Sequence, residues 1–165
     1  MSQKSIISFE TLKCLFPYFF TIDNKYKVID YGPSLKKVCP MIEEGAPIVD
    51  FFSFTGSHDS KLNLHYPGVE KTLFLLSGNE SNLTLRGQVV CLPDDSFLFA
   101  TSPWLQSPDD LVTLGLGVKD FAVHDPVLDL LNVIQSERMA KTEIRELVTK
   151  LSKQKNSSYR RHNAR

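Results

Sequence analysis

Histidines and paired carboxylates are the side chains of this sequence whose types could support chemistry. His58 and His65 flank a weakly patterned stretch, and imidazole is a common ligand for metals and for haem iron. The His124-Asp125 pair could also bind a metal ion, but the sequence places no second cluster of ligands with it. Histidines in loops are usually solvated instead. We therefore predict no metal site, no haem and no other cofactor.

Patterns that mark common catalytic centres do not occur in the sequence. There is no glycine pattern of a nucleophile elbow and no phosphate-binding Gly-x-x-x-x-Gly-Lys loop. Paired carboxylates fall in expected turns or at a helix start, where solvation and capping explain them: Glu43-Glu44, Asp94-Asp95 and Asp109-Asp110. We assign no catalytic residue and predict that this chain is not an enzyme by itself.

The composition is that of one cytoplasmic domain with an appendage. The 165 residues are 42% apolar and carry no net charge, which allows a core and creates no overall field for nucleic acid or anionic membranes. Cys14, Cys39 and Cys91 lie far apart and are expected to be reduced thiols. Neither a signal-peptide pattern nor a run of about 18 apolar residues occurs. We predict a cytoplasmic protein whose partners are neither nucleic acid nor membrane.

Two strand signals near the N-terminus and three near the middle predict one antiparallel sheet. Residues 18–22 and 26–31 are aromatic and β-branched and are separated by Asp-Asn-Lys, which is typical of a hairpin. Residues 72–76, 83–92 and 96–101 follow one another with short turns. This order of elements predicts an α+β fold, in which a five-stranded antiparallel sheet carries short helices on one face.

Short helices are predicted around these strands. Residues 1–15 place apolar side chains at helical spacing, and Ser34 suits the N-cap of a helix over residues 35–38. The remaining predictions are a short helix packed on the sheet over residues 48–54, a turn over 56–59 and mostly loop over 61–70.

Arg86-Gly87-Gln88 lies in the middle of the strand predicted over residues 83–92. A glycine inside a strand marks a bulge or the close approach of another backbone. Ordinary packing with a solvated Arg86 is the simpler interpretation. Contact of this sheet face with a partner or relay element is the alternative.

The C-terminal third is predicted to be helical. The sequence Ser-Pro-Asp-Asp at residues 107–110 marks the start of one helix, which ends near Gly115. A last helix is predicted from Asp125, as its N-cap, to about Gln154. A basic polar tail over residues 155–165 follows it.

Apolar residues of that last helix recur in alternating steps of three and four, which predicts a parallel coiled coil. Glu137 takes one core position, and we interpret it as a device that keeps the coil weak enough to switch. The residues expected at the dimer contact are Leu130, Val133, Ile144, Leu147 and Leu151.

Several blocks of the sequence, taken in order, resemble a known family. They are Phe16 to Asp23, Tyr31 to Leu35, Ile48 to Phe52, Leu85 to Pro93, Phe97 to Trp104, Leu114 to Leu116, Asp120 to Ala122 and His124 to Pro126. Together they resemble the H-NOX-associated domain, a PAS-like module of soluble guanylate cyclases and bacterial histidine kinases. The resemblance covers roughly residues 12–150 and is weak over 56–69.

The resemblance implies a PAS-like fold, dimerisation and a helix that leads to an output domain. The partners it implies are a second copy or a paralogous chain, and an H-NOX domain protein. We expect a signal junction made by Trp104, Asp120, His124 and Asp125. The expected domains are an N-terminal cap over residues 1–15, a PAS-like domain over 16–124, a signalling and dimerisation helix over 125–154 and a basic tail over 155–165.

The predicted function is that of a non-catalytic signalling module. It would relay a signal to a histidine kinase or nucleotide cyclase output domain, or to an H-NOX partner. Two alternatives stay open. One is a small-molecule sensor with its ligand in the Phe-rich core, and the other is a regulatory fragment of a larger guanylate cyclase or histidine kinase.

Overall fold

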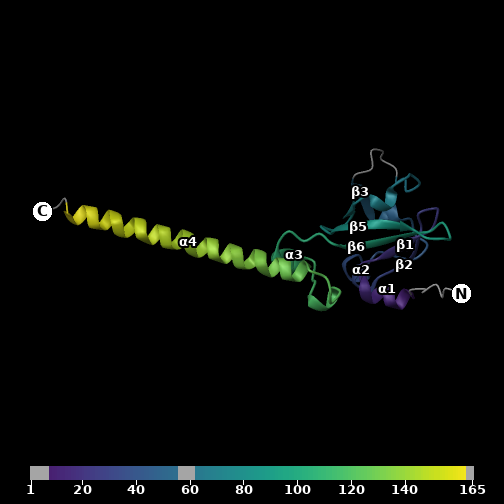
Figure 1. The fold of residues 1–165 in the computed structure, drawn as a ribbon, viewed down its shortest axis with the longest axis horizontal. Coiled ribbons are helices and arrows are strands. Elements are labelled where there is room, and N and C mark those ends of the chain that lie inside the picture. The colour runs from purple at the N-terminus through teal and green to yellow at the C-terminus, as the bar shows by residue number, and fades with distance from the viewer. Residues whose placement is uncertain (1–7, 56–61, 163–165) are drawn as a thin grey trace. The chain divides into compact units, whose positions relative to one another are not determined.

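The computed structural model describes residues 8–55 and 62–162 (Figure 1). Contacts divide the chain into two compact units, Met1–Asp125 and Pro126–Arg165, and each is described by itself. The first unit contains a β-sheet and several short helices. In the second unit, one long helix runs from residue 127 to residue 162.

A six-stranded sheet forms the first unit, in the spatial order β2-β1-β6-β5-β4-β3, and every neighbouring pair is antiparallel. The strands are β1 (Phe20–Ile22), β2 (Val28–Tyr31), β3 (Phe52–Thr55), β4 (Phe74–Gly78), β5 (Thr84–Cys91) and β6 (Phe97–Pro103). The α+β fold and the antiparallel sheet are confirmed, whereas the prediction of five strands is wrong.

The additional strand is β3, which pairs with β4 from Phe52 opposite Gly78 to Thr55 opposite Leu75. The helix predicted over residues 48–54 is reduced to a single 3-10 turn, η1 (Ile48–Asp50). A short apolar run does not distinguish a buried strand from a helix by periodicity, so pairing with β4 decides the outcome. The turn predicted over residues 56–59 lies outside the described residues.

The helix α1 (Phe9–Leu15) and the β1–β2 hairpin form where the sequence predicts them. In the hairpin turn, Asp23 Oδ1 accepts hydrogen bonds from the backbone N–H groups of Lys25 and Lys27, at 2.8 and 2.9 Å. The aspartate thus satisfies backbone donors that the turn leaves unpaired. This explains why the tripeptide Asp-Asn-Lys at residues 23–25 reverses the chain.

The helix α2 (Pro33–Val38) begins earlier than predicted, with Gly32 in the capping position instead of Ser34. Pro33 has the backbone φ that a first helical turn requires, so the helix starts there and Ser34 becomes buried inside it. Gly32 is required by a close approach, because a Cβ at this position would lie 2.1 Å from the carbonyl oxygen of Pro17.

The pairing of β5 with β6 runs without interruption from Leu85 opposite Pro103 to Cys91 opposite Phe97. Gly87 is therefore not a bulge. A Cβ at Gly87 would lie 2.2 Å from the carbonyl oxygen of Ala100, so glycine permits the close approach of the neighbouring strand.

Phenylalanines of neighbouring strands form the centre of the core. The rings of Phe20 and Phe99 stack with centroids 4.6 Å apart, and Phe52 stacks on Phe20 at 6.1 Å. Phe54 and Phe74 each meet Phe99 edge to face at 5.8 Å. Because aromatic pairs stabilise beyond the area they bury, these contacts tie four strands of the sheet to one another.

The segment after β6 contains the predicted helix α3 (Pro108–Thr113). Ser107 and Asp110 make a reciprocal capping box at its start, and Gly115 follows its end with a φ of 65°. A 3-10 turn, η3 (Val118–Asp120), comes next. A further 3-10 turn, η2 (Val69–Lys71), lies at the end of the region predicted to be mostly loop.

The long helix α4 (Val127–His162) makes up the second unit. Its first intrahelical bond joins the N–H of Leu130 to the carbonyl of Pro126 at 3.0 Å, so it starts at Val127. It continues past the predicted end at Gln154, because the sequence contains no proline or glycine after Pro126 that would stop it. Among the described residues, no helix combines the length and the apolar character needed to cross a membrane.

Candidate functional site

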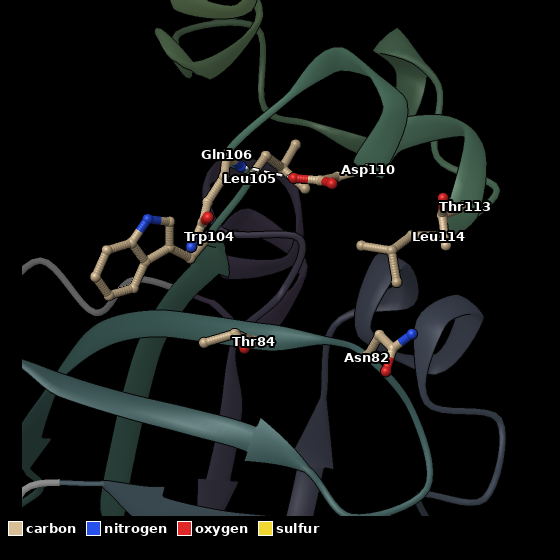
Figure 2. Close-up of a pocket in the computed structure, with 8 residues that line it drawn as sticks. All are labelled: Asn82, Thr84, Trp104, Leu105, Gln106, Asp110, Thr113 and Leu114. Carbon is tan, nitrogen blue, oxygen red and sulfur yellow. Dashed lines mark hydrogen bonds between the residues drawn. The ribbon is translucent and has the colours of Figure 1, made fainter.

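An open pocket of about 360 Å³ lies where β5, β6 and α3 meet (Figure 2). Figure 2 shows Leu105, Gln106 and Asp110 along one side and Asn82 and Thr84 on the other. Its complete lining is Asn82, Thr84, Trp104, Leu105, Gln106, Asp110, Thr113 and Leu114. The polar side-chain groups of this lining are two amides, two hydroxyls, the indole N–H of Trp104 and a single carboxylate.

That carboxylate is engaged in holding the chain. Asp110 Oδ2 accepts hydrogen bonds from the backbone N–H groups of Gln106 and Ser107, at 2.7 and 2.9 Å. Its other oxygen lies 3.0 Å from the Ser107 hydroxyl. Asp110 therefore fixes the start of α3, and this geometry explains it as a capping residue rather than an acid or base.

Trp104 stands at the edge of this pocket and is 42% exposed. Its backbone N–H donates to the carbonyl of Thr84 at 2.8 Å, which extends the β5–β6 ladder. The guanidinium of Arg86 lies over the indole, 5.8 Å from the ring centre. Such a cation–π contact at an exposed site contributes about 0.5–1 kcal/mol. Arg86 is exposed, as the sequence predicts, and it also packs on Trp104.

Asp120 is the most tightly held of the predicted junction residues. It is 7% exposed, accepts from Lys37 Nζ at 2.6 Å and accepts from the N–H of Gly117 at 2.7 Å. Burial opposes its ionisation, but these two hydrogen bonds and the charges of Lys37 and Lys119 hold the pKa of the carboxyl below its ordinary value. The ion pair joins α2 to η3.

Tyr18 lies beside this ion pair, with 1% of its surface exposed and its ring 5.7 Å from that of Phe121. Within the described residues its hydroxyl has no hydrogen-bond partner. Burial, and then the charges of Asp120 and Asp125, raise the pKa of this hydroxyl well above its ordinary value, and an interaction with the Ser34 side chain opposes only a small part of that rise. Tyr18 is therefore a neutral, buried phenol at the junction.

Asp125 is tied to the sheet, since Ser102 Oγ of β6 lies 3.1 Å from its Oδ2. His124 is exposed, and its ring meets Phe16 edge to face at 6.3 Å. Both side chains therefore attach the end of the first unit to elements that precede it by many residues.

The structure thus places the four predicted junction residues in two groups. Asp120 and Asp125 both act on Tyr18, whereas Trp104 packs with Arg86 beside the pocket. Sequence reasoning missed Tyr18 and Lys37. Nothing local could have identified the Lys37–Asp120 pair, because 83 residues separate its two members.

The second candidate region is the α4 seam, which we define as the row of heptad core positions on α4: Leu130, Val133, Glu137, Ala140, Ile144, Leu147 and Leu151. Its five large apolar side chains, those predicted at the dimer contact, are between 57% and 64% exposed. Glu137 makes an ion pair with Lys141 at 2.6 Å on the surface of the same helix.

Of the two histidines considered as metal or haem ligands, His65 packs among aromatic side chains. The ring of His65 packs against Phe97, with centroids 5.2 Å apart, and lies 6.4 Å from Tyr26. His58 lies outside the described residues. In the part of the chain that the structure describes, no three His, Cys, Asp or Glu side chains gather in a way that could hold a metal ion.

Two comparisons with known proteins give a consistent result. The profile of the protein family described as Heme NO binding associated matches residues 55–163, which is more than half of this 165-residue chain. The chain is also similar to the head-specific guanylate cyclase of Drosophila melanogaster, with 25% identity over 139 residues. That similarity covers 75% of this chain and 20% of the fly protein, so the chain spans about a fifth of its relative's length.

Proposed function

The chain belongs to the Heme NO binding associated family, and from this premise we propose that it is a non-catalytic regulatory module of guanylate cyclase signalling. In this proposal, the module dimerises through the α4 seam. It passes a change in its sheet unit to an output domain, a nucleotide cyclase or a histidine kinase, or to an H-NOX partner.

The observation that carries the proposal is the exposure of the α4 seam. Its large apolar side chains are more than half exposed in the single chain: Leu130, Val133, Ile144, Leu147 and Leu151. Each would stabilise a helix pair by about 1.5–3 kcal/mol if it were fully buried. Their alternating spacing is that of a two-stranded coiled coil, so a second helix is the partner that fits.

The junction supports the relay part of the proposal. The Lys37–Asp120 ion pair and the Ser102–Asp125 hydrogen bond hold the chain that precedes α4 to α2 and to β6. A change in the packing of the sheet would therefore alter how that chain is held. Paired helices can transmit such a change as a rotation or a shift in register.

The test is the mass of the full chain in solution, measured by sedimentation equilibrium over a dilution series. The wild type should dimerise. The double variant Ile144→Asp and Leu147→Asp should weaken dimerisation about 100-fold or more, because it places charges in the seam. The matched control, Thr142→Asp and Thr149→Asp, adds the same charge to the outer face of α4 and should leave the mass unchanged.

Two results would reject the proposal. One is a wild-type chain that stays monomeric at every concentration of the dilution series. The other is a dimer that both double variants retain, because the interface would then lie outside the α4 seam.

A small-molecule sensor is a second candidate, favoured by one observation. The pocket beside Trp104 has a volume of about 360 Å³, within the range of about 300–1,000 Å³ for ligand sites. With Asp110 engaged in capping, its amides and hydroxyls suit an uncharged polar ligand. Native mass spectrometry of the purified chain tests this candidate, which fails if no small molecule copurifies and Trp104 fluorescence responds to none.

A further inference from the structure

Another pocket, apart from the one beside Trp104, lies in the first unit and has no role in the proposed function. Its volume is about 350 Å³, within the range of about 300–1,000 Å³ for ligand sites. It lies among the end of α2, the loop after α2, η1 and the β4–β5 turn, and we call it the α2–η1 pocket. Its lining is Val38, Cys39, Pro40, Met41, Glu43, Ala46, Asp50, Phe51, Glu80 and Ser81.

The less exposed part of the α2–η1 pocket is apolar. Val38 is 8% exposed, and Ala46 and Phe51 are half-buried. Cys39 is a half-buried free thiol, which packs as a small apolar side chain does. Met41 is 68% exposed and extends this apolar surface toward solvent. An apolar group that enters the pocket would therefore be removed from water.

Three exposed carboxylates line the same pocket, and each comes from a different segment. Glu43 follows α2 in the loop, Asp50 ends η1, and Glu80 lies in the β4–β5 turn. Among the described residues, none of the three has an ion-pair partner. The described lining also contains no lysine or arginine that could balance them. The pocket thus combines an apolar floor with three unbalanced negative charges.

Hydrogen bonds hold the segments that carry these charges. Lys36 Nζ donates to two backbone carbonyls of the loop after α2, at 2.9 and 2.7 Å, so this nearby cation is engaged with the backbone. Asn79 Nδ2 donates to the backbone carbonyls of residues 49 and 50, at 2.9 and 3.0 Å. This contact ties η1 to the turn that carries Glu80. The pocket is therefore formed before any ligand binds, which lowers the entropic cost of binding.

We propose that the α2–η1 pocket binds a segment of a partner protein that inserts one apolar side chain and carries lysine or arginine on both sides of it. The apolar side chain fits the floor, and the basic residues match the carboxylates. A small ammonium ion offers a single charge, whereas three separate carboxylates suit a chain with several. This contact is independent of the α4 seam, so it adds a second interaction surface to the module.

The probe is a labelled, amidated peptide in which lysines flank a central leucine. A second peptide has serine in place of the leucine and the same charge. Fluorescence anisotropy follows the titration of each peptide with the full chain. The leucine peptide should bind at least about tenfold more tightly than the serine peptide, because only leucine buries a large apolar side chain.

Variants of the full chain test the carboxylates. The pocket variant neutralises all three of them by Glu43→Gln, Asp50→Asn and Glu80→Gln. The matched control neutralises exposed carboxylates outside the pocket by Glu44→Gln, Asp95→Asn and Asp109→Asn. The pocket variant should bind the leucine peptide about tenfold more weakly, and the control should bind it as the wild type does. Circular dichroism checks that both variants fold.

Cys39 reports on where the peptide binds. Its thiol lines the α2–η1 pocket, whereas Cys14 and Cys91 are exposed outside it. Saturating leucine peptide should slow the alkylation of Cys39 by iodoacetamide at least about fivefold, because the peptide covers the thiol. The alkylation of Cys14 and Cys91 should keep its rate. Mass spectrometry of the digested chain measures all three rates.

Four results would overturn the inference. They are no binding of the leucine peptide, equal affinity for the two peptides, an equal loss in the two variants, and binding that leaves Cys39 unprotected. Butylammonium, a small cation with an apolar tail, tests the choice of a protein segment. If it protects Cys39 at the same concentration as the leucine peptide, the partner is not a protein segment. None of these results changes the mass of the chain in solution, so dimerisation through the α4 seam is tested separately.

Discussion

Lys37 Nζ lies 2.6 Å from Asp120 Oδ2, although 83 residues of sequence separate the two. The pair links α2 to η3, and the N–H of Gly117 completes the environment of the carboxylate. The Asp120 side chain is nearly buried, whereas that of Lys37 is 40% exposed. Solvent therefore screens part of the attraction, and the contribution of the pair lies between that of a surface ion pair and a buried one.

Replacing Asp120 by asparagine should lower the free energy of unfolding by about 1–2 kcal/mol. The substitution keeps the shape but removes the charge that Lys37 and the N–H of Gly117 bond. Urea unfolding at pH 7 measures the loss. Asp109→Asn is the control, because Asp109 is exposed in the first turn of α3 and should cost less than about 0.5 kcal/mol.

The effect of Asp120→Asn on the free energy of unfolding should depend on pH. The folded-state pKa of Asp120 lies below its ordinary value, so its ionised form stabilises the fold above about pH 4. This contribution is lost as the pH falls through the lowered folded-state pKa. The stability difference between wild type and Asp120→Asn should therefore shrink between pH 5 and pH 2. A difference that stays constant over this range would contradict the assigned role.

Tyr18→Phe should be tolerated at pH 7, with a change between no effect and a gain of about 1 kcal/mol. The hydroxyl is buried without a partner among the described residues, so removing it takes away an unpaired polar group. Because the folded-state pKa of Tyr18 is raised, the unfolded chain releases the phenolic proton first as the pH rises above about 10. The wild type therefore loses stability at higher pH, and the full stability is present only below about pH 10.

Unfolding experiments at pH 7 and at pH 10.5–11 distinguish these effects. The wild type should lose stability relative to Tyr18→Phe at the higher pH. Tyr66→Phe is the control, since Tyr66 is exposed and its hydroxyl lies 2.9 Å from the hydroxyl of Thr72. If the free energy of unfolding of both variants changes equally between the two pH values, Tyr18 is not the residue responsible for the loss in the wild type.

Gly87→Ala should destabilise the sheet by at least about 2 kcal/mol. The new methyl group would lie 2.2 Å from the carbonyl oxygen of Ala100, and only separation of β5 from β6 could relieve this contact. Thermal unfolding measures the effect. Gly117→Ala is the control, since the nearest atom to a Cβ there is 3.8 Å away, and equal losses in both variants would show that the close approach does not matter.

Glu137→Leu should strengthen self-association by about tenfold or more. The substitution removes the like charges of the core layer and adds an apolar side chain to the α4 seam. Sedimentation equilibrium of the full chain measures the change. Glu146→Leu places the same side chain at an outer position of α4 and should have little effect. An equal gain in both variants would indicate non-specific hydrophobic association instead of contact through the α4 seam.

Local patterns in the sequence were sufficient for much of the fold. Alternation of apolar residues predicts β5 and β6, the Asp-Asn-Lys turn predicts the first hairpin, and the Ser-Pro-Asp-Asp start predicts α3. These signals consist of backbone preferences and of the spacing of apolar residues. Both are determined by residues that are close together in the sequence. The heptad spacing of α4 is of the same kind, and it supplies the predicted dimer contact.

Only the tertiary structure decided the features that join distant residues. The apolar run at residues 48–54 fits a helix or a strand until β4 offers a partner edge for Phe52 to Thr55. The burial of Tyr18, the Lys37–Asp120 pair and the stacking of Arg86 on Trp104 likewise depend on which elements become neighbours in space. Sequence patterns report the local preferences of a chain, whereas burial and pairing at this junction arise from contacts among elements far apart in it.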